Sequence, residues 1–184
     1  SKGSILGDKT RMEELAGSHR AYIRPSPSGG TLGGVARKTR ETIILCEAAG
    51  FDTIFVETVG VGQDEVDVVK SAQTTVIMVI PGMGDDIQAM KAGLLEIGDV
   101  FIVNKADLAG SEELVRLLEG MLHLRADAVS SWRPPVIQTV ALRNEGVAEL
   151  IDACFDFHRQ ASASGLLSQR IAGNHTAFLR QLVM

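Results

Sequence analysis

Cysteine is scarce in this sequence, and so are aromatic residues. The 184 residues include two cysteines, and Cys46 and Cys154 have neither the spacing of a zinc site nor a CxxC partner. This excludes a disulfide framework, and isolated thiols in apolar segments are typical of a reducing compartment, so we expect a cytoplasmic protein. The four histidines are scattered and form no metal-binding pattern.

Long apolar runs and an excess of positive charge are also missing. No segment reaches the roughly 18 consecutive apolar residues that a membrane span requires, so we expect no membrane partner. The formal net charge is −5, which argues against a nucleic-acid-binding surface as the main function. With 45% hydrophobic and 22% charged residues, the chain has the composition of an ordinary globular domain with a full core.

Strand-like and helix-like segments alternate along the chain. Apolar, β-branched runs lie at 52–58, 74–82, 99–105 and 134–141, and a short mixed run lies at 20–24. Their nearly continuous apolar character predicts strands that are covered on both faces, as in a parallel sheet. Helical patterns lie at 35–50, 85–98, 111–124 and 145–160. The alternation predicts an α/β fold with a doubly wound, mostly parallel sheet.

Two of the predicted helices have clear ends, and the tail differs from the rest. The first helix closes on Gly50, a suitable residue just after a helix terminus. The helix at 111–124 opens on Ser111 and places four apolar residues on one face: Leu114, Leu117, Leu118 and Met121. The tail from residue 161 onward predicts one further helix, a C-terminal helical extension without a partner in the sheet.

Functional residues of such sheets lie at the carboxyl ends of the strands. Asn104, Lys105 and Asp107, in the motif "NKAD", follow the apolar run 99–105 at such an end. A carboxylate can accept hydrogen bonds from the ring N–H and the exocyclic amine of guanine, and adenine offers no matching pair of donors. The motif therefore predicts a guanine-binding loop.

The next predicted strand end supplies a dependent hypothesis. "TVALRNEG" follows the run 134–141, and three of its backbone N–H groups are candidates to contact the guanine carbonyl oxygen: those of Val140, Ala141 and Leu142. This hypothesis carries no weight without the guanine loop.

"VETVGVGQDE" places Glu57 at the end of another predicted strand, with Gly60 close behind. A carboxylate there can hold a hydrated Mg²⁺ or position a water, and the glycine allows backbone N–H groups to approach a γ-phosphate. The alternative is a carboxylate that caps the next helix, and the residues alone leave both open.

A phosphate cradle requires the motif GxxxxGK[ST] between a strand and a helix. "SGGTLGGVARKT" has Gly29 and Gly34 at the right separation, but Val35 stands where lysine is required and no strong strand precedes it. We therefore interpret it as a Gly-rich switch loop in which Thr31 contacts a phosphate or Mg²⁺. No phosphate cradle is present in the 184 residues.

Taken together, "GSILGDKTRM", "VETVGVGQDE", "PGMGDDIQAMKAG" and "NKAD" closely resemble the methylmalonyl-CoA-mutase-associated GTPases of the MeaB/ArgK family. The similarity runs from about residue 3 to residue 150. The resemblance implies a P-loop NTPase fold that binds GTP or GDP with Mg²⁺ and forms homodimers. It also implies a chaperone that gates cofactor loading of an adenosylcobalamin-dependent acyl-CoA mutase and protects that mutase.

The resemblance also implies roles for individual residues. Asp8 matches the switch aspartate near Mg²⁺ and the γ-phosphate, and Glu57 matches the Walker-B-side carboxylate, so both are candidate metal-site residues. Gln88 and Lys91 match an additional switch that couples GTP hydrolysis to the mutase. Val140 departs from the family, which usually has serine there, and so lacks a hydroxyl.

The ends of the chain depart further from the family. We expect residues 1–160 to form a GTPase domain that lacks its N-terminal P-loop portion, and residues 161–184 to begin a helical dimerisation arm. Without the P-loop lysine and backbone nest, these 184 residues alone should bind GTP poorly and hydrolyse it at most very slowly.

Two other functions remain as alternatives. One is a degenerate GTPase-like module that docks on a mutase without turnover. The other is a metal-insertion GTPase, which the lack of a Cys/His cluster disfavours. A dinucleotide oxidoreductase is weaker still, because no GxGxxG motif follows a strand.

Overall fold

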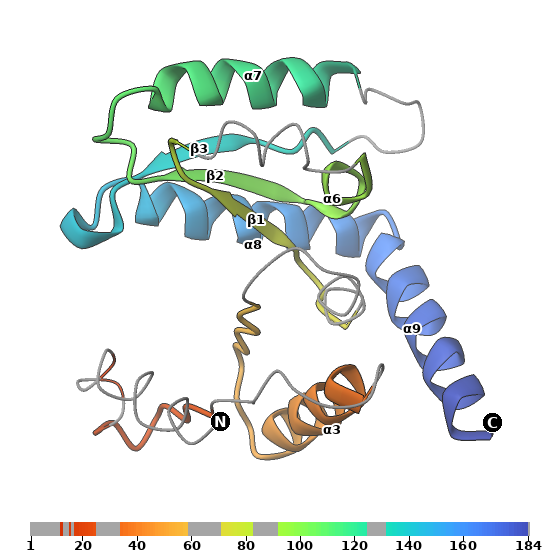
Figure 1. Ribbon diagram of the computed structural model, residues 1–184. Coiled ribbons are helices and arrows are strands. Elements are labelled where there is room, and N and C mark those ends of the chain that lie inside the picture. Colours follow the sequence, from red (N-terminus) through yellow and green to blue (C-terminus); the bar gives the residue numbers. More distant parts are fainter. Residues whose placement is uncertain are drawn as a thin grey trace. The chain divides into compact units, whose positions relative to one another are not determined.

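The structure is a computed structural model, and it describes residues 12, 15, 17–24, 34–58, 71–82, 92–124 and 132–183. The chain divides into two compact units, and each is considered separately. The first unit contains helix α3 (Gly34–Ala48), drawn in orange in Figure 1, and the second contains the sheet and the remaining helices.

Helix α3 confirms the helix predicted at 35–50 and its terminal glycine. After the helix, the Gly50 N–H donates to the Glu47 carbonyl at 3.0 Å and the Phe51 N–H donates to the Cys46 carbonyl at 3.1 Å. This pair of bonds is the Schellman arrangement, which requires a left-handed residue after the helix. Gly50 has φ +85°, a conformation that glycine adopts without steric cost.

The strand predicted at 20–24 is wrong, since this segment is irregular and packs beside α3. Arg24 Nη1 donates to Thr42 Oγ1 of α3 at 2.9 Å, and the ring of Tyr22 lies 6.4 Å from that of Phe51. These side-chain contacts hold the segment without any strand pairing. The short mixed run contained too little pattern to separate the two outcomes.

The buried strand predicted at 52–58 is also wrong. The segment forms no strand, and the side chain of Phe55 is 91% exposed. Glu57 lies in the same irregular stretch and is exposed. An apolar pattern indicates that a segment suits a sheet, but a strand forms only when a neighbour pairs with it, and periodicity does not identify the neighbour.

The second unit contains a parallel sheet of three strands: β1 (Val76–Val79), β2 (Val100–Asn104) and β3 (Val136–Thr139). β2 lies in the middle, with Val76 opposite Val100 on one side and Phe101 opposite Val136 on the other. The three strands predicted at 74–82, 99–105 and 134–141 are confirmed, each shorter than its apolar run. The parallel order also confirms the predicted α/β class.

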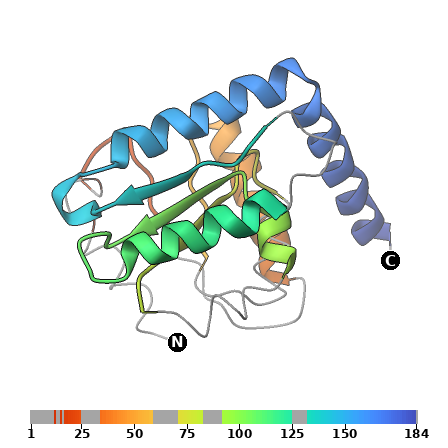
Figure 2. The same cartoon turned by 90° about the horizontal axis from the view of Figure 1, so that it is seen from above.

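The central strand is buried along its length. Residues 100–103 are each at most 2% exposed, as a nearly continuous apolar run predicts for a strand covered on both faces. Helix α7 (Ser111–Leu124) covers one face and helix α8 (Val147–Ala163) covers the other, which Figures 1 and 2 show from two directions. The sheet is therefore wound on both sides.

Helix α7 has the predicted bounds, but its buried face differs slightly from the prediction. Leu114 and Leu118 pack against Val79 and Val103 of the sheet. Leu117 was expected on the same face and is 47% exposed, because Val115 packs against this cluster and the contact face is rotated toward it. The prediction for Leu117 is therefore wrong.

The remaining helices are short or lie toward the C-terminus. Helix α6 (Ala92–Ile97) confirms the end of the helix predicted at 85–98, whose residues 85–91 lie outside the described part of the chain. Helix α9 (Leu166–Val183) confirms a helical tail and leads away from the sheet in Figure 1. Among the described residues, no helix combines the length and apolar character needed to cross a membrane.

The tail nevertheless has a partner at the sheet. Arg170 of α9 donates from Nη1 and Nη2 to the two carboxylate oxygens of Asp99, both at 2.8 Å, and the Thr75 N–H donates to Oδ2 at 2.9 Å. Asp99 is only 4% exposed and directly precedes β2. The hydrogen bond to Asp99 raises the pKa of Arg170 above its usual value, so the guanidinium stays charged.

Two aromatic rings lie close to this ion pair. The guanidinium of Arg170 lies 5.2 Å from the centre of the Phe157 ring, and Trp132 meets Phe157 edge-on at 5.3 Å between ring centres. The Trp132 Nε1–H also donates to the Asp99 carbonyl at 2.8 Å. Trp132 is therefore a packing residue that contacts both Phe157 and the backbone of Asp99.

We predict that Arg170→Ala lowers the free energy of unfolding by about 3 kcal/mol, because it leaves the buried Asp99 carboxylate without its counter-charge. Arg116→Ala, which removes an exposed ion pair with Glu112 on α7, should cost less than about 1 kcal/mol. Urea unfolding of both variants measures the difference. Equal losses would mean that the link between α9 and the sheet contributes no special stability.

Candidate functional site

The side-chain oxygen of Asn104 connects the ends of two strands. Oδ1 accepts hydrogen bonds from the Lys105 N–H at 2.9 Å, the Thr139 hydroxyl at 3.2 Å and the Ala141 N–H at 3.3 Å. All three partners are donors, so this atom must be the oxygen of the amide. Among the described residues, the amide nitrogen donates to the sulfur of Met78, at 3.9 Å. Asn104 therefore keeps its acceptor inside the protein and has a donor to offer to a ligand.

The turn after Asn104 is held by short-range contacts. Lys105 adopts φ +56°, a left-handed conformation that few non-glycine residues accept. The Ala106 N–H donates to the Thr139 carbonyl at 3.0 Å, and the Ser111 hydroxyl donates to the Ala106 carbonyl at 2.8 Å. A strained backbone conformation of this kind persists only where the surrounding contacts enforce it. Here it forms the turn between Asn104 and Asp107.

The loop after β3 is closed on itself. The Val140 N–H donates to the Glu145 carbonyl at 3.0 Å, and the Glu145 N–H donates back at 3.3 Å, enclosing the 3-10 turn η1 (Ala141–Arg143). Asn144 follows the turn with φ +56°. The six residues 140–145 are thus held by a pair of reciprocal backbone bonds, which makes the loop a rigid support for the side chains it carries.

Gly146 closes the loop against the end of β3. It has φ +71°, and a Cβ at this position would lie 2.0 Å from the carbonyl oxygen of Gln138. No side chain fits there without a backbone shift. Glycine at this position therefore permits both the loop closure and the start of α8.

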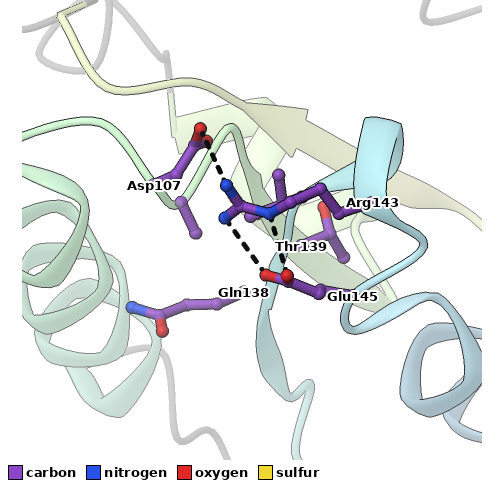
Figure 3. A pocket seen from close by; sticks show the side chains of 7 residues that line it. Asp107, Gln138, Thr139, Arg143 and Glu145 are labelled. Carbon is purple, nitrogen blue, oxygen red and sulfur yellow. Dashed lines mark hydrogen bonds and ion pairs between the residues drawn. The ribbon is translucent and has the colours of Figure 1, made fainter.

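Charged side chains from the two loops meet (Figure 3). Arg143 donates from Nε to Glu145 Oε1 at 2.8 Å and from Nη2 to Oε2 at 3.2 Å, and its Nη1 lies 3.7 Å from Asp107 Oδ2. Hydrogen bonding and attraction to Glu145 raise the pKa of Arg143 above its usual value, and Asp107 adds a smaller attraction. The guanidinium thus lies between two carboxylates.

These groups line a hollow of about 260 Å³. Pockets for drug-sized ligands are roughly 300–1,000 Å³, so this hollow suits a base rather than a whole nucleotide. Its walls come from the two loops and the end of β3: Ala106, Asp107, Gln138, Thr139, Val140, Arg143 and Glu145. Asn104 precedes the lining residue Ala106 by two positions in the sequence, but it does not itself line the hollow.

Comparison with known proteins identifies the family. The model of the family described as "Methylmalonyl Co-A mutase-associated GTPase MeaB" matches residues 1–184. The chain belongs to this family. The match confirms the resemblance seen in the motifs and agrees with the parallel α/β fold, which is consistent with a P-loop NTPase.

Individual relatives support the same family assignment. The chain is 44% identical to a Caulobacter vibrioides protein over 183 residues, covering 98% of this chain and 56% of that protein. It is 43% identical to the Escherichia coli protein named GTPase ArgK, covering 91% and 51%. It is 40% identical to the mouse "methylmalonic aciduria type A homolog, mitochondrial", covering 100% and 45%. The chain spans about half the length of the curated relatives it matches.

The structure brings the predicted guanine-site residues together at the ends of β2 and β3. Asn104, Lys105 and Asp107 share one loop, and Val140, Ala141 and Leu142 lie beside it in the second unit. Glu57 lies in the first unit. The other predicted site residues lie outside the described part of the chain: Asp8, Thr31, Gly60, Gln88 and Lys91.

The predicted backbone donors to guanine are partly in use. The Val140 N–H already donates to Glu145 and the Ala141 N–H to Asn104, whereas Leu142 lies at the exposed tip of the loop. For Mg²⁺, the described residues contain no group of three or more acidic, histidine or cysteine side chains, so the part of the chain in view does not supply a ligand set.

Sequence reasoning missed the Arg143–Glu145 pair. Its signal was present in "RNEG", where opposite charges two residues apart flank an asparagine before a glycine. Asn-rich and Gly-rich turns bring such neighbours onto one side of a loop.

We predict that Gly146→Ala lowers the free energy of unfolding by about 3 kcal/mol, from the unfavourable φ and the clash with the Gln138 carbonyl. Gly165→Ala is a matched control, because Gly165 has φ +77° but nothing lies within 4 Å of the added Cβ. Its cost should be about 1 kcal/mol. Thermal unfolding of both variants compares them, and a control as damaging as Gly146→Ala would contradict the close approach.

Proposed function

We propose that the protein recognises the guanine base of GTP and GDP through Asp107 and Asn104. The observation that carries this proposal is the position of the Asp107 carboxylate on a base-sized hollow at the carboxyl ends of parallel strands. A carboxylate there accepts from the ring N–H and exocyclic amine of guanine. Adenine would present a ring nitrogen with a lone pair at the same place, and the two acceptors would repel each other.

Asn104 contributes a hydrogen-bond donor, whereas Asp107 contributes acceptors. Its oxygen accepts three internal hydrogen bonds, so the amide nitrogen is the group directed to an acceptor atom of the purine. Lys105 follows in a left-handed turn, with φ +56°. The Leu142 N–H at the tip of the second loop is the proposed donor to the guanine carbonyl oxygen.

We further propose that the whole protein hydrolyses GTP with Mg²⁺. Family membership and a relative named GTPase ArgK support this. Roles in phosphate, metal and water contacts stay predictions from the family resemblance for Asp8, Thr31, Glu57, Gly60, Gln88 and Lys91. Mg²⁺, when bound, would neutralise charge on the phosphates.

The mutase connection belongs to the same proposal. The family description names methylmalonyl-CoA mutase, and the name of the mouse relative refers to methylmalonic aciduria. We propose a chaperone that gates cofactor loading of an adenosylcobalamin-dependent acyl-CoA mutase and protects it. In this scheme residues 1–160 belong to the GTPase domain, and residues 161–184 begin an arm that forms a homodimer.

Helix α9 supports the arm assignment, because it leaves the sheet and is anchored near its start by Arg170. A cytoplasmic location is also part of the proposal. Both cysteines in the described chain are free thiols, as in a reducing compartment.

We predict that Asp107→Asn weakens GDP binding at least about 100-fold, because two charge-assisted hydrogen bonds are lost. Xanthine carries an oxygen where guanine carries the exocyclic amine, so the new amide should donate to it, and XDP should become the preferred ligand. Calorimetry on the whole gene product, whose intact mass is determined first, measures both affinities.

The matched control is Asp152→Asn, which changes an exposed carboxylate on α8 in the same way. It should leave the preference for GDP intact. Loss of GDP binding without a gain for XDP would argue that Asp107 supports the loop rather than reads the base.

We predict that the protein slows inactivation of an adenosylcobalamin-dependent methylmalonyl-CoA mutase in the presence of GTP. The Asp107→Asn variant should lose this effect with GTP and regain it with XTP, since only base recognition is changed. Mutase activity followed through repeated turnover measures the protection. Association with the mutase without nucleotide turnover would instead support the non-hydrolysing docking module.

A further inference from the structure

Arg143 has a geometry that the proposed base recognition does not by itself explain. Its Nη1 approaches Asp107 Oδ2 at 3.7 Å, while Nε and Nη2 are both held by Glu145. A guanidinium has five donors in a rigid plane, so fixing one edge on a carboxylate also fixes where the remaining donors point. Glu145 thereby directs Nη1 toward Asp107 (Figure 3).

The support behind this arrangement is rigid. Arg143 and Glu145 belong to the loop that Val140 and Glu145 close with two backbone hydrogen bonds. Gly146 then packs that loop directly against the backbone of β3. Arg143 therefore projects from a fixed frame toward a carboxylate on the neighbouring loop.

Asp107 needs such a fixed partner. The last torsion of an aspartate side chain is broad, so its carboxylate plane is not determined by the backbone alone. Both oxygens must face the guanine edge together to accept two donors.

The strength of the contact also fits a positioning role. At 3.7 Å the approach is longer than a hydrogen bond, and both side chains are partly exposed. An exposed ion pair of this kind is weak, because water screens the two charges. A weak contact is sufficient to favour one orientation of the carboxylate, and it leaves lone pairs on Asp107 for the base.

Charge gives a second reason for the arginine. Asp107 and Glu145 line the same small hollow, and the guanine base is neutral. Without Arg143, two carboxylates would face each other across that hollow and repel. The guanidinium between them removes this repulsion before the nucleotide arrives.

We propose that Arg143 is a positioning residue that orients Asp107 for guanine, and that Glu145 in turn holds Arg143. This inference rests on the proposed recognition of guanine by Asp107. It assigns a role to two residues beyond the "NKAD" loop itself. Preorganising the carboxylate reduces the ordering cost that the nucleotide would otherwise meet on binding.

The test is a double-mutant cycle read by nucleotide affinity. Arg143→Ala should weaken GDP binding about 5-fold, the factor that corresponds to an exposed ion pair. Arg143→Lys should recover part of the loss, and Glu145→Gln should cause a smaller loss in the same direction. On the Asp107→Asn background, where no carboxylate remains to orient, Arg143→Ala should leave XDP binding unchanged.

The control and a second measurement separate positioning from folding. Arg159→Ala removes another exposed arginine that pairs with a carboxylate, Asp156 on α8, and should leave GDP affinity unchanged. The nucleotide-free Arg143→Ala variant should unfold at the same urea concentration as the unmodified protein. A fall in that midpoint matching the loss of affinity would overturn the positioning role.

Other outcomes are equally decisive. An equal loss of XDP binding on the Asp107→Asn background would overturn the inference, because Arg143 would then act without Asp107. Tighter GDP binding by Arg143→Ala would also overturn it, because the arginine would then compete with the base. If Arg143→Ala leaves GDP affinity unchanged while Asp107→Asn changes the preference from GDP to XDP, the positioning role is wrong and the proposed function stands. If Asp107→Asn does not change the preference to XDP, the proposed function is wrong as well.

Discussion

The three hydrogen bonds accepted by Asn104 Oδ1 are the interaction on which the candidate site depends. They join the end of β2 to the end of β3 and to the loop that follows it. Parallel strands bring their carboxyl ends to one edge of a sheet, but neighbouring loops still need a link to keep a common geometry. The amide oxygen provides that link together with the bond from the Ala106 N–H to the Thr139 carbonyl, and the meeting of Asp107 and Arg143 depends on it.

A second constraint lies at the opposite end of the same strand. Asp99 directly precedes β2 and holds Arg170 of α9, whereas Asn104 ends the strand. The residues between them are almost completely buried and packed from both faces. β2 is therefore a rigid element with a polar anchor at each end, one for the C-terminal helix and one for the proposed base site. The placement of α9 and of the guanine loop depends on the same strand.

Much of the second unit was predictable because its signals are local. Continuous apolar runs predicted the three strands, and Ser111 and the apolar spacing predicted α7 with its observed bounds. The strand predictions for 20–24 and 52–58 were wrong for a common reason. A strand forms only when a neighbouring strand pairs with it, and a local pattern does not identify that neighbour. The prediction that Leu117 is buried was wrong, because the spacing of apolar residues along α7 does not determine which of two adjacent faces of the helix packs on the sheet.

The sequence by itself determined the chemical elements of the site: the amide, the ammonium and the carboxylate of "NKAD" directly after a buried strand, and the motifs that indicated the family. Only the tertiary structure decided which other groups meet that carboxylate. Arg143, held by Glu145, reaches Asp107 from a loop more than 30 residues away, and Arg170 reaches Asp99 across 71 residues. Contacts at such separations depend on how strands align in the sheet and how loops close. They are properties of the packed fold, and no short stretch of sequence contains them.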